Sequence, residues 1–246
     1  MDTPSLVALS RLVSQQRAMD VTATNLANAS TPGFQAGRMV FSDWLSRQVR
    51  TDSPPGGATV AYVQDRATYR DQAQGTLQHT GNPFDLALSG EGYFTVETAR
   101  GPRLTRAGRF TPGADGTVGD ADGNALLDNE GKRLRLSPGD THIAVSADGT
   151  ISSENGRIGR VGVVRPADLY RMQAEGGRTL RADTPTAPVE NARIVQGAVE
   201  DSNVQPVLET TRMMAAVREF QFASQFVQGE SDRQTKAIDK LTQRRQ

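Results

Sequence analysis

Two long stretches without proline and almost without glycine, one at each end of the chain, most strongly limit what this sequence can fold into. The first runs from Ser5 to Asn28, and the second runs from Val207 to Gln246 with one interruption at Gly229. Glycine and proline are the residues that destabilise a helix interior most. We therefore expect a long α-helix at each end of the chain.

Both stretches have recognisable ends. Ser30-Thr31-Pro32-Gly33 combines turn-forming residues with proline and glycine, so the first helix must stop before it. Ahead of the second stretch, Ser202-Asn203 is predicted to cap the helix, and Pro206 fits a first helical turn, where its missing N–H has no effect. After the first helix, an extended segment beginning at Phe34 leads to a loop at Ser53–Gly57.

Apolar residues recur along both stretches at alternating spacings of three and four residues, which is the period of a coiled-coil seam. In the N-terminal stretch the seam positions are Leu9, Leu12, Gln16, Met19, Ala23 and Leu26. In the C-terminal stretch they are Met213, Val217, Phe220, Ser224, Val227, Ser231, Gln234, Ile238 and Leu241. The polar members weaken both seams.

A stripe with this period is more often core within one chain than an interface between chains. Isolated helices take most of their stability from packing, so helices with weak seams need partners. Those partners are the other terminal helix or neighbouring chains. Two such helices at opposite ends of a chain, separated by a region of a different structural class, favour assembly with other chains.

The middle of the chain has the pattern of β structure. Short runs rich in β-branched, aromatic and aliphatic residues predict strands at Tyr93–Val96, Thr117–Val118, Ala125–Leu127, Ile143–Val145 and Arg160–Val164. Asp-Gly pairs at 115–116, 122–123 and 148–149 predict hairpin turns of type I′. This region is therefore expected to be built from hairpins.

These observations predict an α+β fold in three parts. Residues 1–58 form a helix and an extended linker, 59–196 form a β-rich domain, and 197–246 form a helix that packs with the first. The two ends can meet only if the middle loops out and returns. The terminal helices are then expected to form a coiled-coil-like stalk.

Composition excludes several classes of function. With 28 basic and 28 acidic residues, the chain gives no electrostatic reason to expect nucleic acid or an anionic membrane as a partner. It has no cysteine, which excludes disulfides, thiolate nucleophiles and cysteine-based metal sites. No uncharged apolar run is long enough for a membrane span. Met1-Asp2-Thr3-Pro4 does not begin a secretory signal, so no cleaved signal peptide is expected.

Candidate chemical sites are few. His79 and His142 have no second histidine at metal-ligand spacing. Asp120–Asn124 resembles the start of a calcium loop but has no acidic residue to close it. Gly90-Glu91-Gly92 precedes a predicted strand, whereas a phosphate-binding loop precedes a helix. No catalytic, cofactor or metal site is therefore predicted.

Four segments, in order along the chain, resemble the signatures of one family. These are Asn25–Phe34, Gly81–Phe94, Leu104–Phe110 and Gly197–Val207. The first resembles the N-terminal signature of the flagellar axial proteins of the rod and hook group, although Thr24 stands where asparagine is common. The third resembles the Tyr-Thr-Arg-x-Gly-x-Phe strand of that group, with Leu104 in place of tyrosine.

Within the group, the length and the opening Val7–Arg11 best suit the proximal rod type, with the distal rod or another axial subunit as the alternative. The resemblance implies a non-enzymatic subunit of the basal-body rod that transmits torque. It implies export through the flagellar type III apparatus and assembly in the periplasm. The implied partners are copies of itself and other rod subunits, with no cofactor, small-molecule substrate, nucleic acid or membrane insertion.

The residues expected at the assembly interface come from the two seams and from the signature segments. They are Leu9, Leu12, Met19, Leu26, Asn25, Asn28, Phe34, Asn203, Met213, Val217, Phe220, Val227, Ile238 and Leu241. Asn25 and Asn28 are expected either to satisfy backbone groups at the helix end or to fix the turn that leads into Phe34. Before assembly the helices lack partners and are expected to be largely disordered, which suits passage through a narrow export channel.

Two other functional classes stay open from sequence. One is a binding or adhesive module, in which the β domain holds a ligand and the helices only dimerise it. The other is a hydrolase of cell-wall glycan that depends on Asp85 or Glu91.

Overall fold

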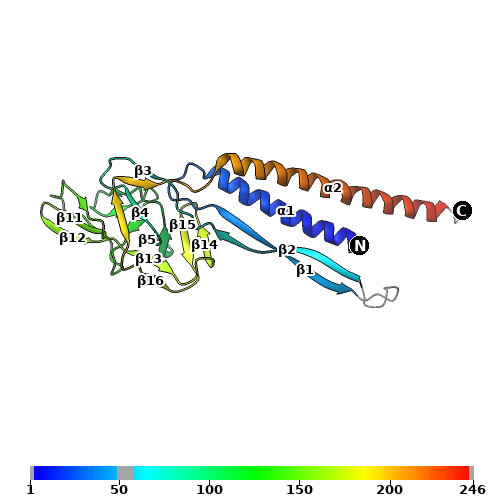
Figure 1. The fold of residues 1–246 in the computed structure, drawn as a ribbon, viewed down its shortest axis with the longest axis horizontal. Helices are drawn as coiled ribbons and strands as arrows, with labels where there is room; N and C mark the ends of the chain where they lie inside the picture. Colours follow the sequence, from blue (N-terminus) through cyan, green and yellow to red (C-terminus); the bar gives the residue numbers. More distant parts are fainter. Residues whose placement is uncertain (1–2, 49–57, 244–246) are drawn as a thin grey trace. The chain divides into compact units, whose positions relative to one another are not determined.

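The computed structural model describes residues 3–48 and 58–243 and contains a long helix at each end with short strands between them (Figure 1). Helix α1 spans Thr3–Ala27 and helix α2 spans Pro206–Gln243. The predicted α+β class, with terminal helices around a β-rich middle, is confirmed. The loop expected at Ser53–Gly57 lies outside the described residues.

Contacts divide the chain into two units. Unit 1 comprises Met1–Leu26, Gly37–Thr68 and Gln205–Gln246, and unit 2 comprises Ala27–Ala36 and Tyr69–Val204. Unit 2 therefore contains the short segment that follows α1 as well as the central β region. The domain limits expected after residues 58 and 196 fall at the start of strand β2 and between strands β17 and β18.

Unit 1 combines the two helices with a two-stranded sheet of β1 (Gly37–Gln48) and β2 (Ala58–Arg70). The helices run antiparallel. Asn25, near the end of α1, donates a hydrogen bond to Glu209 in the first turn of α2, and Gln15 donates to the carbonyl of Ala216 one to two turns further along. Figure 1 shows the C-terminal part of α2 extending past the N-terminal end of α1.

The start of α2 differs from the predicted cap. The helix begins at Pro206, and the N–H of Glu209 donates to the carbonyl of Gln205 at 3.0 Å. Gln205 is therefore the flanking residue of the first turn. Ser202 and Asn203 lie too early in the chain to cap α2, and Asn203 uses its side chain within unit 2 instead.

Unit 2 contains the remaining strands. They are β3 (Leu77–His79), β4 (Leu86–Ser89), β5 (Tyr93–Thr98), β6 (Gly101–Thr105), β7 (Thr111–Pro112), β8 (Val118–Gly119), β9 (Ala125–Leu126), β10 (Ala144–Val145), β11 (Thr150–Ser153), β12 (Gly156–Arg160), β13 (Val163–Pro166), β14 (Met172–Glu175), β15 (Thr179–Ala182), β16 (Thr186–Pro188), β17 (Arg193–Gln196) and β18 (Ala198–Glu200).

The largest sheet of unit 2 has nine strands. Its main path is β14-β15-β6-β5-β9-β8-β7, and β13 pairs with both β5 and β16. Separate small sheets are formed by β10-β11-β12, β17-β4 and β18-β3. In the last two sheets, strands from the end of the β region pair with strands from its beginning. The chain therefore returns to where the β region started.

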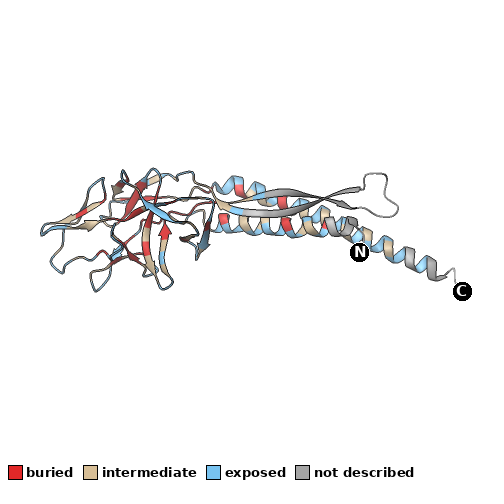
Figure 2. Cartoon of the chain, turned by 90° about the horizontal axis from the view of Figure 1, so that it is seen from below, coloured by how far each residue is buried: buried red, intermediate tan, exposed pale blue. Residues whose placement is uncertain are grey.

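The core of unit 2 lies between these strands. Phe94, Phe110 and Leu126 are fully buried, and the rings of Phe94 and Phe110 meet edge to face with centroids 5.6 Å apart. Figure 2 shows buried residues concentrated in the β region. Burying an aromatic or aliphatic side chain of this size contributes about 1.5–3 kcal/mol.

All three predicted hairpins form, but their turn type was predicted wrongly. Gly116, Gly123 and Gly149 have φ of 78°, 81° and 86°, whereas no other residue type has positive φ in the described part of the chain. A type I′ turn needs positive φ at both central residues, which excludes it here. Each glycine N–H instead donates to the carbonyl three residues earlier, as in a type I turn followed by a left-handed glycine.

The predicted strands are confirmed where Tyr93 opens β5, where Ala125 opens β9 and where Val145 ends β10. The prediction of one strand over Arg160–Val164 is wrong, because this segment joins the end of β12 to the start of β13. Gly162 lies between the two strands and packs so closely against the backbone of Asp128 that an added Cβ would be 2.5 Å from its carbonyl oxygen. Before this point the chain pairs with β11, and after it the chain pairs with β5.

Candidate functional site

The residues of α1 that are most buried in this chain differ from the predicted seam. Ala8 and Asn25 are buried, whereas their neighbours Leu9 and Leu26 are 49% and 38% exposed. Gln15, which contacts α2, precedes the predicted seam member Gln16. The buried face of α1 is thus displaced by one residue from the predicted seam. Leu12 and Met19 are half-buried.

The α2 seam agrees in part with the prediction. Met213, Phe220 and Val227 are half-buried, but the buried position between the first two is Ala216, while Val217 is 39% exposed. The side chains of Ile238 and Leu241 lie outside the described part of the chain. An interface role for all these residues stays a prediction.

The buried apolar residues in the described part of the two helices are small. They are Ala8 on α1 and Ala216 on α2. Among the larger apolar residues, Leu9 and Val217 are exposed, whereas Leu12 and Phe220 are half-buried.

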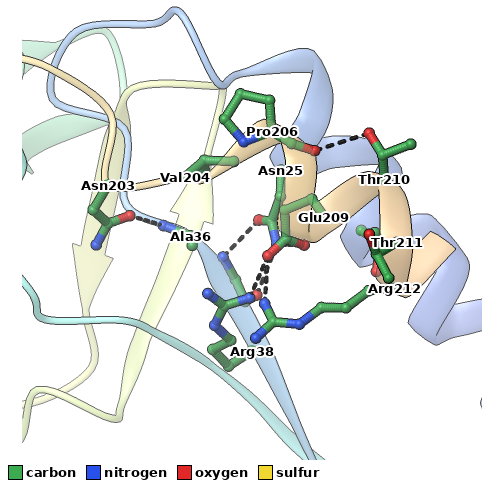
Figure 3. A network of polar contacts seen from close by, with 12 residues as sticks. Asn25, Ala36, Arg38, Asn203, Val204, Pro206, Glu209, Thr210, Thr211 and Arg212 are labelled. Atoms are coloured by element: carbon green, nitrogen blue, oxygen red, sulfur yellow. Dashed lines mark hydrogen bonds and ion pairs between the residues drawn. The ribbon is translucent and has the colours of Figure 1, made fainter.

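Asn25 lies at the centre of a hydrogen-bonded cluster in unit 1 (Figure 3). Its Oδ1 accepts a hydrogen bond from the N–H of Gly37 at 2.7 Å, and its Nδ2 donates to the carbonyl of Gly37 at 3.0 Å. Nδ2 also donates to Oε2 of Glu209 at 3.2 Å. The asparagine therefore joins the end of α1, the start of β1 and the first turn of α2.

Glu209 is the charged member of this cluster and is 1% exposed. Its Oε1 accepts hydrogen bonds from Arg38 at 2.6 Å and from Arg212 at 2.5 Å, as Figure 3 shows. Burial alone would raise the pKa of Glu209. The hydrogen bonds from Arg38 and Asn25 and the charges of both arginines outweigh burial and lower that pKa. Glu209 is therefore ionised near neutral pH.

A second cluster, in unit 2, contains the predicted residues Phe34 and Asn203. Asn203 accepts a hydrogen bond from the N–H of Ala36 at 2.7 Å, and its Nδ2 donates to the carbonyls of Asp71 and Ala73. Phe34 is buried beside Ala36 and Val204. Asn203 thus ties together three stretches of chain that are far apart in sequence.

Asn28 lies in the turn that follows α1. Its carbonyl accepts a hydrogen bond from the N–H of Thr31 at 3.1 Å, and its Oδ1 accepts one from Thr31 Oγ1 at 3.3 Å. These bonds close the turn after α1. Gly33, with φ of 71°, completes it.

A third cluster, which we call the clasp, is formed by Arg106, Glu200 and Tyr93 in unit 2. The Arg106 and Glu200 side chains are 5% and 3% exposed and form an ion pair at 3.0 Å. Arg106 lies over the Tyr93 ring at 5.3 Å, and Glu200 also accepts a hydrogen bond from the N–H of Gly75 at 3.0 Å. The pKa of Tyr93 is raised, mainly because burial disfavours the charged form of its hydroxyl group. The nearby charge of Arg106 acts in the opposite direction but does not outweigh burial.

Sequence reasoning missed Glu209, Arg38 and the clasp. The available signals were a glutamate in the first turn of α2 and a charged residue, Glu200, directly after the apolar pair Ala198-Val199. Neither signal identifies its partner, because Arg106 lies 94 residues from Glu200 and Asn25 lies 184 residues from Glu209.

The other candidate residues form no reactive set. Asp85 is buried and accepts hydrogen bonds from Thr80 and Asn82, whereas Glu91 is exposed and pairs with Arg165. His79 is exposed on β3. Across residues 3–48 and 58–243 there is no group of three metal-ligating side chains, and no described helix is long and apolar enough to cross a membrane.

Comparison with known families gives three matches in order along the chain. Residues 6–35 match the model described as flagella basal body rod protein. Residues 87–153 match the flagellar hook protein FlgE/F/G D1 domain, and residues 195–239 match the flagellar basal body rod FlgEFG protein C-terminal. The first match covers most of α1 and ends just before β1, and the last includes β18 and most of α2.

Full-length relatives agree with these matches. The chain is 34% identical to the flagellar basal-body rod protein FlgF of Caulobacter vibrioides, over 98% of both chains. It is 32% identical to FlgF of Mesorhizobium japonicum over 96% of both. It is 29% identical to the flagellar basal-body rod protein FlgG of Bacillus subtilis, over 89% of this chain and 91% of that protein.

Proposed function

The chain belongs to the flagellar basal-body rod proteins of the FlgF type, and from this premise we propose that it polymerises in the proximal rod through its terminal helices and transmits torque. As a family member it is a structural subunit, not an enzyme, and it assembles with other subunits in the basal body. Family membership decides against the dimerised binding module and the hydrolase.

One observation supports polymerisation through the helices above all others: both helices keep large apolar side chains exposed. On α1 these include Leu9 at 49% and Val13 at 46%, and on α2 they include Val207 at 83%, Met214 at 58% and Phe222 at 71%. Removing such area from water stabilises an interface by about 25 cal/mol per Å². Val207 and Met214 lie seven residues apart, on the same side of α2, and exposed apolar side chains that share one side of a helix are typical of a surface that binds another protein.

The length of α2 supports the same proposal. It has 38 residues, against 25 in α1. At 1.5 Å per residue, the 13 additional residues correspond to about 20 Å of helix. An isolated helical segment of this length is marginal in water. Neighbouring subunits are expected to supply the missing partner, and the helices then form the stalk predicted from sequence.

The relatives named FlgF support the proximal position, and the relative named FlgG keeps the distal rod as the alternative. A density map of isolated basal bodies would separate the two. Density for this chain in the proximal layer supports the proposal, and density in the distal layer alone contradicts it. Family membership also supports export through the flagellar type III apparatus.

We expect limited proteolysis of the dilute, purified protein to remove the two ends and leave a protected middle. The terminal helices have few partners in a single chain, whereas unit 2 has a continuous core. Mass spectrometry of the fragment that resists a protease of broad specificity, such as proteinase K, is expected to place its ends close to residues 29 and 204, on the basis of the division into units. Survival of intact α1 and α2 under conditions that cut denatured chain would contradict the proposal that the helices await partners.

Deleting Lys236–Gln246 is expected to abolish swimming while the shortened protein remains soluble. The deletion removes part of α2 beyond the face that α1 covers and leaves unit 2 unchanged. Motility agar measures the first effect, and the soluble fraction of a cell lysate measures the second. The matched control is Lys236→Ala, an exposed single change. Normal swimming of the deletion strain would count against an assembly role for the end of α2.

A further inference from the structure

Unit 1 contains a groove of about 300 Å³ between α1, the start of β1 and α2. Val21 of α1, Met39 of β1 and Ala216 of α2 form apolar parts of its wall. Arg212 and Glu209 form a polar part of the wall. The groove therefore combines an apolar surface with a guanidinium group.

Arg212 is only partly neutralised. Its side chain is 44% exposed, and Oε1 of Glu209, which it contacts, also accepts a hydrogen bond from Arg38. A carboxylate accepts several hydrogen bonds, but it supplies one negative charge to two guanidinium groups. The exposed edge of Arg212 thus favours a further carboxylate at the groove.

A flank of α2 has the complementary chemistry. Glu219, Phe222 and Phe226 follow one another at spacings of three and four residues, which places them on the same side of the helix. Phe222 is 71% exposed and Phe226 is 54% exposed. Glu219 is exposed and has no ion-pair partner among the residues described. Two of the eight phenylalanines of the chain are therefore exposed beside a carboxylate that has no cationic partner within the described part of the chain.

The flank of one chain cannot fill the groove of the same chain. Arg212 and Glu219 lie seven residues apart on α2, which separates them by about 10 Å along a rigid helix. The occupant must come from another molecule. Contact between two different surfaces of identical chains is heterologous, and it generates an open helical polymer when rotation does not close the ring.

We propose that the groove of one copy receives Phe222 and Phe226 from α2 of the next copy, with Glu219 paired to Arg212 across the interface. This inference rests on the proposed function and names the surfaces through which copies of this chain meet. Apolar burial supplies the stability of the contact, and the charge pair sets its register. A two-fold contact, in which like surfaces meet, is the competing arrangement.

The absence of cysteine from the chain allows a direct test. Val21→Cys places a thiol in the groove and Phe226→Cys places one on the flank. Basal bodies from cells that express the double variant are treated with a short bismaleimide crosslinker and separated by denaturing electrophoresis. We expect a ladder of dimers, trimers and higher species from the double variant, monomer from each single variant, and only dimers when the two single variants are coexpressed.

A charge substitution in the same background tests the ion pair. Glu219→Lys places a lysine against Arg212 and is expected to reduce the crosslinked fraction about tenfold or more, since opposed like charges in an interface cost several kcal/mol. Gln221→Lys adds the same charge on another side of α2 and should leave the ladder unchanged.

Two results would overturn this inference but leave the proposed function standing. The first is the absence of a ladder although the double variant is present in basal bodies and the cells swim. The second is the formation of crosslinked dimers by the single variant Phe226→Cys. Absence of the unsubstituted chain from basal bodies would instead contradict the proposed function and, with it, the inference.

Discussion

Replacing Gly33 with alanine is expected to destabilise unit 2 by about 3 kcal/mol or more. Gly33 has φ of 71°, and an added Cβ would lie 2.2 Å from the nitrogen of Ala107 and 2.3 Å from the carbonyl carbon of Arg106. Both are backbone atoms, so they cannot turn away. The segment that contains Gly33 would have to move away from Arg106 and Ala107, which would break the 2.7 Å hydrogen bond from the Gly33 N–H to the Glu200 carbonyl. It also exposes Phe34, whose burial contributes about 1.5–3 kcal/mol.

Calorimetry of the full-length protein measures this effect as a fall in the Tm of unit 2 of roughly 10 °C, at about 2–4 °C per kcal/mol. Gly81→Ala is the matched control, because Gly81 has φ of 75° but nothing lies within 4 Å of its added Cβ. The control carries only backbone strain of about 1–2 kcal/mol. Equal Tm values for the two variants would show that the close approach at Gly33 does not contribute to the stability of unit 2.

Glu200→Ala is expected to destabilise unit 2 by about 3–5 kcal/mol, the usual cost of removing one partner from a buried ion pair. The substitution leaves the guanidinium of Arg106, which is 5% exposed, without its carboxylate. It also removes the acceptor of the Gly75 N–H. Urea unfolding of the full-length protein, followed by circular dichroism, measures the loss.

Two comparisons define the origin of that loss. Glu130→Ala removes an exposed pair with Lys132, with side chains 63% and 74% exposed, and should change stability by no more than about 1 kcal/mol. The double variant Arg106→Met with Glu200→Leu replaces both charges by apolar groups and should be much more stable than Glu200→Ala alone. If Glu200→Ala matched the exposed control, the clasp would not stabilise unit 2.

Local rules predicted much of the secondary structure. The absence of proline and near absence of glycine at both ends predicts α1 and α2, because such stretches contain little that opposes a helix. The Asp-Gly pairs predicted the three hairpins, since glycine readily takes positive φ. Their turn type depended on the preceding residues, and the aspartates keep negative φ. The Arg160–Val164 strand failed because a close approach at Gly162 interrupts it.

Sequence signatures also located parts of the candidate site. Asn25, Phe34 and Asn203 were singled out by resemblance, and each is held by contacts between distant stretches of chain. Their partners could not be predicted, because a hydrogen bond between residues far apart in sequence depends on how the chain returns. Asn203 was expected at a helix cap and instead joins strand ends.

By itself, the sequence determined the two terminal helices, the hairpin-built middle and the family to which the chain belongs. These follow from local conformational preference and from ordered motifs. Only the tertiary structure decided which face each helix buries and where its charges are paired. The three-and-four period describes a stripe but not its partner, and in the folded chain Ala8 and Ala216 are buried whereas Leu9 and Val217 are exposed. Leu9, Val13 and Val217 remain exposed in one chain, and in the proposed assembly contact with another chain would bury them, because apolar surface is most stable when it is removed from water.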